Sequence, residues 1–290
     1  MIILIDGDVL AQIACHSNQE VHHTYEDLYL GRLTETEIKK ILKEGYDSTK
    51  LQKFIFVKPL GFINDEAITH VCNSINLRIT LITNAVANMF KIDQEDITCE
   101  FYLTYPDKSN FRYSIATIGD GYKANRKNLR KPKLLTHAWE YVRDIHKGVV
   151  VHNREADDEI ADMFRHHQKL VGKDNVVIAS IDKDFLQLEG WHIDSKKLAF
   201  KQQSATDAIQ HLYYQIIEGD IADNIPGLKY FFPPRSCGET TTRKRVAKWT
   251  THKELYQLCK TLWLDYSDLG PVKFEEVFKE MYRLVKLGGV

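Results

Sequence analysis

A chain of 290 residues is long enough to bury a sizeable core in one large domain or two ordinary ones. Its composition, 43% hydrophobic and 27% charged, excludes the profiles of an intrinsically disordered chain and of an integral membrane protein. The net charge of -1 does not exclude a nucleic-acid partner, because acids and bases gather in separate stretches of the chain.

The N-terminal apolar run is short. It covers residues 2–5, has no basic segment before it and ends at Asp6, so we expect neither a signal peptide nor a transmembrane helix, and a cytoplasmic protein. The five cysteines lie far apart and form no C-x-x-C pair, which argues against a disulfide framework and against a zinc finger. We expect all of them to be reduced.

The first segment predicts the opening of an α/β domain. Residues 2–5 predict a buried strand, and the spacing of the apolar residues after Asp6-Gly7-Asp8 predicts a helix. In sheets of parallel strands, ligands bind beyond the carboxyl ends of the strands. Asp6 stands at such an end.

The stretch from residue 16 to 58 has a weak pattern. Residues 34–43 predict one solvated helix, and residues 54–57 predict a strand. The histidines of this stretch lie among polar residues, with no acid or cysteine at ligand spacing, so we assign no chemistry to His16, His22 and His23.

Two further elements lead to a second acid at a strand end. Residues 75–89 predict an amphipathic helix, and residues 97–105 predict a strand. Asp107 follows that strand as Asp6 follows the first one. By itself, an aspartate beside a proline is more often a turn residue.

The run at residues 121–133 is strongly basic. Together with Arg112 it holds seven basic groups and no acid, and it includes Tyr122 and Pro132. Most charge runs are solvated helices, but cations interleaved with an aromatic residue and ended by a proline are expected of a loop or arch that binds phosphates.

An acidic helix follows a predicted helix at residues 134–145 and a short predicted strand at residues 148–152. It begins at Glu155-Ala156-Asp157-Asp158-Glu159, which is four acids in five residues. Capping and compensation of the helix dipole need only one or two acids. The excess indicates a binding site.

The next buried strand, at residues 176–179, also ends in acids, Asp182 and Asp184. A few strand-like residues at 196–201 and a predicted helix at 205–218 then lead to a turn that holds Asp220 and Asp223. Beyond it, a Pro/Gly hairpin is followed by a basic helix, and the chain to about residue 286 is predicted to be helical.

These segments place acids where an α/β sheet would gather them. Packed carboxylates raise one another's pKa values and stay ionised only beside cations. All the candidate ligands are oxygens, which favours Mg2+ or Mn2+ over zinc, and their number suits two-metal phosphoryl transfer. The predicted ligands are Asp6, Asp107, Glu155, Asp157, Asp158, Asp182, Asp184, Asp220 and Asp223.

The basic groups predict phosphate contacts. Lys123 and Arg126 are one helical turn apart, so both can reach a scissile phosphodiester, one as a point charge and one as a fork. The hairpin at Gly238 and the basic helix would hold duplex backbone without reading its sequence. The predicted substrate contacts are Tyr122, Arg112, Lys127, Arg130, Lys131, Gly238, Arg243, Lys244 and Arg245.

Six motifs in order resemble the 5′-nuclease (flap endonuclease-like) superfamily, most closely the 5′-3′ exonucleases of tailed phages and the 5′-nuclease domain of bacterial DNA polymerase I. They span roughly two thirds of the chain. They are Leu4 to Asp8, Asp107 with Asn110-Phe111-Arg112, Tyr122 to Arg126, Glu155 to Asp158, Asp182-Lys183-Asp184 with Gln187-Leu188, and Gly219-Asp220 with Asp223 to Gly227.

The resemblance implies a PIN-like α/β core at residues 1–204 with a central, mainly parallel sheet and an arch at about 119–134, followed by a helical helix-hairpin-helix region at 205–290. It also implies a monomer that hydrolyses DNA, or RNA primers, at 5′ ends, nicks or flaps with Mg2+ and leaves 5′-phosphates, in phage DNA replication or recombination.

The resemblance also assigns roles to the residues that match its motifs. Asp6, Asp107, Glu155, Asp157 and Asp158 would belong to the first metal cluster, and Asp182, Asp184, Asp220 and Asp223 would bind or hydrate the second metal. Lys123 and Arg126 would contact the reacting phosphate. The pattern is broken by residues 229–236, which are inserted before the hairpin and argue against the K+ site that the family has there. The arch is also short.

Two other functions fit part of the pattern. Haloacid-dehalogenase-type phosphatases also have a strand ending in Asp-x-Asp and a later run like Gly219 to Asp223, but in that fold the second element ends a strand, and here it follows a predicted helix. A non-catalytic protein that binds DNA ends or junctions could use the acids to hold structural cations, although a full ligand set is more than that role needs.

Overall fold

Strand β1 (Ile2–Asp6) lies in the middle of a six-stranded sheet. The computed structural model describes residues 1–16, 19–27, 31–34, 51–59, 65–107, 109–126, 131–233 and 236–288. The strand order is β6-β5-β1-β7-β8-β9. β9 pairs antiparallel with β8, and the other pairs are parallel, so the predicted mainly parallel sheet is confirmed. The strands are β5 (Thr98–Thr104), β6 (Val149–Val151), β7 (Val176–Ala179), β8 (Gly190–Ile193) and β9 (Phe200–Gln203).

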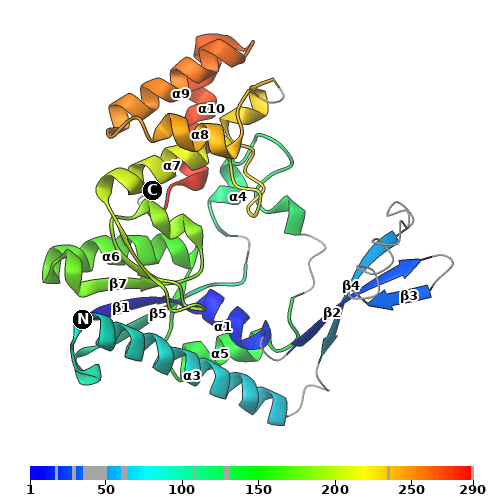
Figure 1. Ribbon diagram of the computed structural model, residues 1–290, viewed down its shortest axis with the longest axis vertical. Coiled ribbons are helices and arrows are strands. Elements are labelled where there is room, and N and C mark those ends of the chain that lie inside the picture. Colours follow the sequence, from blue (N-terminus) through cyan, green and yellow to red (C-terminus); the bar gives the residue numbers. More distant parts are fainter. Residues whose placement is uncertain are drawn as a thin grey trace.

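Helices cover both faces of this sheet (Figure 1). One face carries α1 (Gly7–His16), α3 (Asp65–Phe90) and α5 (Leu135–Asp144), and the other carries α6 (Ala156–Val171). Side chains alternate along a strand, so Ile3 and Ile5 belong to the core beneath α1, α3 and α5, whereas Leu4 packs with Phe164 of α6. β1 is apolar on both faces because both faces are buried.

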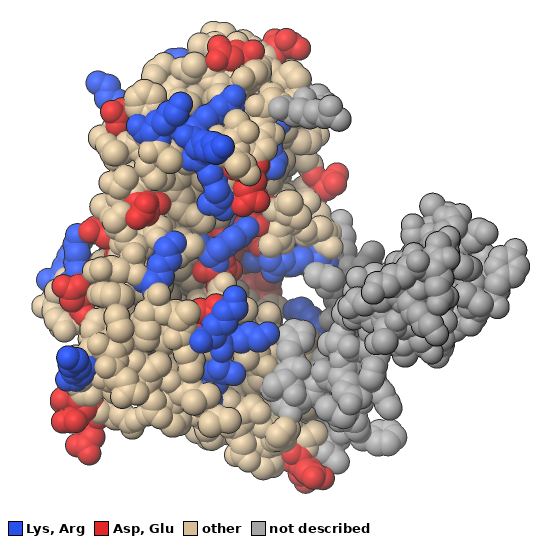
Figure 2. All heavy atoms as spheres, in the orientation of Figure 1, with Lys and Arg blue, Asp and Glu red and all other residues tan. Residues whose placement is uncertain are grey.

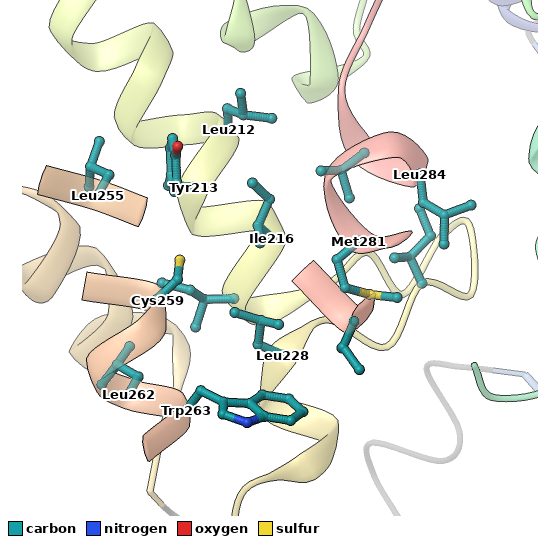
Figure 3. Close-up of a cluster of buried hydrophobic side chains, with 14 of the residues drawn as sticks. Leu212, Tyr213, Ile216, Leu228, Leu255, Cys259, Leu262, Trp263, Met281 and Leu284 are labelled. Carbon is teal, nitrogen blue, oxygen red and sulfur yellow. The ribbon is translucent and has the colours of Figure 1, made fainter. Parts of the chain in front are cut away.

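A helical region follows β9 and has its own hydrophobic core (Figure 3). It comprises α7 (Ala205–Glu218), α8 (Glu239–Val246), α9 (His252–Tyr266) and α10 (Gly270–Val285). Local signals start two of these helices: Ser204 caps α7, and Thr251 forms a capping box with Glu254 at the start of α9. Trp263 and Phe274 are fully buried in this core.

The chain then returns to the sheet region. Leu287 packs in the core beneath α6, so the last described residues belong to the wall of the α/β part and not to the helical core. The predicted division between residues 204 and 205 therefore stays a prediction. None of the described helices is long and apolar enough to cross a membrane.

Short 3-10 helices and one small helix complete the described part of the main body. They are η2 (Gln94–Asp96), α4 (Arg112–Ile115), η3 (Ala124–Arg126), η4 (Lys173–Asn175), η5 (Lys183–Gln187) and η6 (Leu228–Phe231). The predicted basic run thus contains one short 3-10 turn in its described part, and its members Lys127 and Arg130 lie outside the described residues.

The largest differences from prediction lie before residue 100 and at β8. The stretch with a weak pattern contains an antiparallel sheet of β2 (Gln19–Asp27), β3 (Gly31–Thr34) and β4 (Leu51–Pro59), in the order β3-β2-β4. The predicted strand at 54–57 lies in β4. The helix predicted at 34–43 is contradicted at Thr34, which is in β3, and its other residues lie outside the described part. The sequence does not predict β8, because four residues beginning with glycine carry no alternation.

Candidate active site

Asp6 ends β1 and is buried at the carboxyl edge of the sheet. Its Oδ1 accepts a hydrogen bond from the backbone N–H of Val9 at 3.0 Å, and its Oδ2 accepts one from the hydroxyl of Ser180, just after β7, at 2.9 Å. Burial, followed by the charge of Asp8, raises the pKa of Asp6 to about 7. Carboxyl groups with a pKa raised this far are typical of functional sites.

Asp8 is a site residue that is missing from the predicted set. It lies in the first turn of α1, and its Oδ2 accepts the backbone N–H of Thr104, at the end of β5, at 3.0 Å. Burial raises the pKa of Asp8, and the charge of Glu155 adds to the effect. The signal that could have found it is the Asp6-Gly7-Asp8 spacing, since both acids flank the turn from strand to helix.

The start of α6 brings two more acids to the same edge. Glu155 is the N-cap residue, and the next backbone N–H, of Ala156, donates to Oγ1 of Thr104 at 2.9 Å, which ties the helix start to β5. Burial raises the pKa of Asp157 well above its usual range, and the charges of Asp6 and Asp182 add to it. Asp157 therefore faces the ends of β1 and β7.

Asp182 and Asp184 follow β7, as predicted from the sequence. Asp182 caps η5 by accepting the N–H of Asp184 at 2.8 Å, and its own N–H donates to Ser180 at 3.0 Å. Burial raises the pKa of both carboxyls, and that of Asp184 is further raised by Asp182 and Asp220. Ser180 thus joins the acids at the end of β7 to Asp6.

The loop at residues 219–227 is closed by two glycines in the left-handed region. Gly219 has φ +76° and Gly227 has φ +70°. A Cβ on Gly219 would lie 2.1 Å from the carbonyl oxygen of Ile225, and a Cβ on Gly227 would lie 2.3 Å from the nitrogen of Gly219. Only glycine allows this approach, and it presents Asp220 and Asp223 to the cluster.

We expect Gly219→Ala to destabilise the protein by more than about 1 kcal/mol, because the added methyl meets backbone as well as an unfavourable φ. Gly270→Ala is the matched control, since Gly270 has φ +70° and nothing within 4 Å of the place that an added methyl would take. Urea unfolding of both variants separates the two effects. Equal free energies of unfolding would show that close approach at Gly219 has no importance.

Tyr122, Lys123 and Arg126 lie beside these acids. The Lys123 ammonium pairs with Glu155 and lies 3.6 Å from Asp223, and Arg126 pairs with Asp223. The Tyr122 hydroxyl lies 2.7 Å from an oxygen of Glu155 and 2.7 Å from one of Asp223. Burial alone would lower the pKa of Lys123, but Glu155 and Asp223 outweigh it and the pKa is raised. Lys123 therefore stays cationic.

The loop and the Lys123 segment hold each other through the backbone. The N–H of Lys123, which has φ +53°, donates to the carbonyl of Asp223 at 2.8 Å. Nε of Arg126 donates to the carbonyl of Ala222 at 3.0 Å, and Nδ2 of Asn125 to that of Ile221 at 2.7 Å. The predicted phosphate-binding residues and the last pair of acids therefore form one unit.

Three predicted site residues form their hydrogen bonds with partners outside the acidic cluster. Arg112 and Asp158 are 2% and 1% exposed and form a bidentate ion pair at 2.5 and 2.8 Å, which leaves Arg112 no access to a substrate. Asp107 is exposed and accepts from the N–H and hydroxyl of Ser109, and these hydrogen bonds lower its pKa. The predictions that Arg112 binds substrate and that Asp107 and Asp158 bind metal do not fit these positions.

Most of the other predicted substrate contacts that the structure describes lie on the surface. Figure 2 shows carboxylates between Lys and Arg side chains in the middle of one face. Lys131, Gly238, Arg243 and Lys244 are exposed, and the Arg243 guanidinium lies 3.9 Å from the centre of the Tyr214 ring. Arg245 is partly buried and donates to Cys237 and Tyr266, so it supports the hairpin before α8.

The cluster is anionic. It holds Asp6, Asp8, Glu155, Asp157, Asp182, Asp184, Asp220 and Asp223, and it is contacted by the cations Lys123, Arg126 and Lys183. Burial and the charges of neighbouring acids raise the pKa values of five of them, Asp6, Asp8, Asp157, Asp182 and Asp184. Among the residues that the structure describes, no three acidic, histidine or cysteine side chains form a ready metal-ligand group. The donors are nevertheless all oxygens, and the acids outnumber the cations that contact them, which fits a divalent cation such as Mg2+ or Mn2+.

Without metal ions, the protein is expected to lose stability as the pH rises from 5 to 8. The folded pKa of Asp6, about 7, lies above its ordinary value of 3.8, so its stabilising contribution is complete below pH 3.8 and is lost as the pH passes 7. A tenfold change in an ionisation constant corresponds to about 1.4 kcal/mol. Urea unfolding in EDTA at the two pH values measures this, and a larger free energy of unfolding at pH 8 would contradict it.

Comparison with known proteins supports the fold. The chain is similar to a variant of the bacteriophage T5 flap endonuclease in a pseudo-enzyme–product complex with DNA and metal ions, with 13% identity, a TM-score of 0.51 and coverage of 98% of this chain and 88% of that one. It is also similar to a mutant of the T5 5′-exonuclease, with 12% identity, a TM-score of 0.50 and coverage of 98% of this chain and 86% of that one. The predicted 5′-nuclease-like fold is confirmed. No protein-family model and no curated protein matches the sequence.

Proposed function

We propose that this protein is a divalent-metal-dependent 5′-nuclease, which hydrolyses phosphodiester bonds of DNA at 5′ ends or flaps and leaves 5′-phosphates. The observation that carries the proposal is the gathering of eight carboxylates from four chain segments beside the cationic Lys123. The T5 proteins that share the fold, a flap endonuclease with DNA and metal ions and a 5′-exonuclease, support this choice over other hydrolases.

The acids divide into two groups by their place on the sheet edge. One cation would lie between the ends of β1 and β5 and the start of α6, bound by Asp6, Asp8, Glu155 and Asp157. A second cation would lie between the end of β7 and the loop after α7, bound by Asp182, Asp184, Asp220 and Asp223. Bound divalent cations would supply Lewis acidity and neutralise charge at the phosphodiester. Asp107 and Asp158 are left out, because their carboxylates are engaged elsewhere.

The basic residues would bind and orient the phosphate. The Lys123 side chain is 16% exposed and pairs with Glu155, so its charge lies inside the site. The Arg126 side chain is 43% exposed, so its planar guanidinium would bind an adjacent phosphate. The Tyr122 hydroxyl holds Glu155 and Asp223 next to Lys123. Electrostatic groups that are already in place are the usual source of rate in phosphoryl transfer.

The exposed bases near α8 would hold the duplex. Gly238, Arg243 and Lys244 lie at the start and on the surface of α8, which packs against α7. In the proposal, α7, the connection at residues 219–238 and α8 act as a helix-hairpin-helix module that contacts phosphates without reading bases. Such binding is expected to weaken strongly with salt.

Cleavage of a labelled 5′-flap duplex in Mg2+, compared with blunt, nicked and gapped duplexes and with EDTA, tests the proposal. We expect metal-dependent products that carry a 5′-phosphate. Release of phosphate from a small monoester without DNA cleavage would favour a phosphatase. Binding of the flap duplex with no cleavage in either Mg2+ or Mn2+ would favour a non-catalytic protein.

A further inference from the structure

The last described residues of the chain form part of the wall of the site. Leu284, Val285 and Leu287 line a small cavity together with Glu155, Asp157 and Asp184. Leu287 is buried against the core beneath α6. The end of α10 and the residues after it therefore lie beside the acids.

A buried ion pair holds this C-terminal segment, residues 284–288. Nε and Nη2 of Arg112 donate to the carbonyls of Leu284 and Lys286 at 2.9 and 3.1 Å, while the same guanidinium grips Asp158. Oδ1 of Asp158 in turn accepts the N–H of Gly288 at 3.1 Å. Three hydrogen bonds from this ion pair therefore hold the segment in place.

Two glutamines connect the segment to Asp184. The N–H of Leu287 donates to Oε1 of Gln187 at 3.2 Å, and Nε2 of Gln187 donates to Oε1 of Gln215 at 2.7 Å and to the carbonyl of Val285 at 2.7 Å. Nε2 of Gln215 then donates to Oδ1 of Asp184 at 2.6 Å. The hydrogen bonds from Leu287 through Gln187 to Gln215 thus run in one direction and end at the carboxylate, while a second hydrogen bond from Gln187 ties its amide to Val285.

We propose that Gln187 and Gln215 are positioning residues that, together with the C-terminal segment, hold the Asp184 carboxylate oriented for a divalent cation. The inference rests on the proposed function only in assuming that this site takes such a cation. A directional chain of hydrogen bonds polarises its last member, and a donor to a ligating carboxylate fixes which lone pairs remain for the metal. Gln215 is buried, so its amide is held in place at Asp184.

The test measures Mn2+ binding to the free protein by electron paramagnetic resonance, without DNA. Gln215→Met keeps the side-chain length but removes the donor to Asp184, and we expect it to weaken binding by roughly tenfold or more, since a hydrogen bond to a charged group is lost. Gln187→Met leaves the donor of Gln215 in place but removes the hydrogen bonds that connect Gln215 to the C-terminal segment, so we expect a smaller loss of Mn2+ affinity. Gln168→Met is the control, because Gln168 donates to the backbone carbonyl of Glu189, away from the acids.

Thermal melting in EDTA shows whether each variant is folded. If Gln215→Met does not fold, Gln187→Met decides. Unchanged Mn2+ affinity in the folded variants, or equal losses in Gln168→Met, would overturn the inference while leaving the proposed nuclease untouched. Mn2+ binding that Gln215→Met weakens, in a wild-type protein that cleaves no DNA, would uphold the inference and reject the proposed function.

Discussion

Asp157→Asn is expected to lower the rate of cleavage of a 5′-flap duplex by at least about 100-fold, because even the hydrogen-bond partners of metal ligands are worth roughly 10–100-fold. Asp157 lies centrally among the acids, facing Asp6 and Asp182. Asparagine keeps the shape but gives up the charge that binds a cation. Single-turnover cleavage in Mg2+ measures the loss.

The same substitution is expected to stabilise the metal-free protein. Burial and neighbouring acids raise the pKa of Asp157 well above its usual range, so its ionised form opposes folding at neutral pH. Removing that charge should raise the melting temperature in EDTA at pH 8 by roughly 2 °C or more. Added Mg2+ should then stabilise the variant less than the wild type.

Asp162→Asn on the same helix is the control, since Asp162 pairs with Arg154 and Arg165 away from the cluster. It should keep the rate and should not gain stability. A fully active Asp157→Asn protein, or one that melts below the wild type in EDTA, would refute the place given to Asp157.

Lys123→Ala is expected to slow the chemical step by about 10²–10³-fold while changing the Kd for a flap duplex far less. Its ammonium is largely buried among acids and would act on the charge that develops at the phosphate, where one such group is typically worth that much. Most binding energy comes from many phosphate contacts on the surface, so one cation in the site contributes little to Kd. Single-turnover rates and salt-dependent binding separate the two effects.

Lys123→Arg adds a sharper comparison. This variant keeps the charge, but the planar guanidinium of arginine does not fit the place that the compact lysine ammonium takes between Glu155 and Asp223. We therefore expect a rate between those of Lys123→Ala and the wild type. Lys173→Ala is the control, because Lys173 is exposed and pairs with Glu189 far from the site. Loss of binding without loss of rate in Lys123→Ala would make Lys123 a duplex contact instead.

The sequence already determines most of the sheet and which acids stand at its edge. The apolar runs before Asp6 and Asp182 are short, unbroken and followed by polar residues, and such patterns depend on local burial alone. β1, β5, β6, β7, α6 and α7 therefore lie close to their predicted ranges. The hydrophobic pattern does not predict β8, because its four residues form a strand through pairing with β7 and β9 on either side.

The tertiary structure decides which of these acids act together. Asp157 and Asp158 are neighbours in sequence, but successive residues of a helix point about 100° apart, so Asp157 faces the sheet edge and Asp158 faces Arg112 and the chain's last described residues. In the same way Asp8 enters the cluster through Thr104, and Gln215 reaches Asp184 from a helix 31 positions away. Side-chain direction and long-range partners depend on packing between distant segments, and no local pattern encodes them.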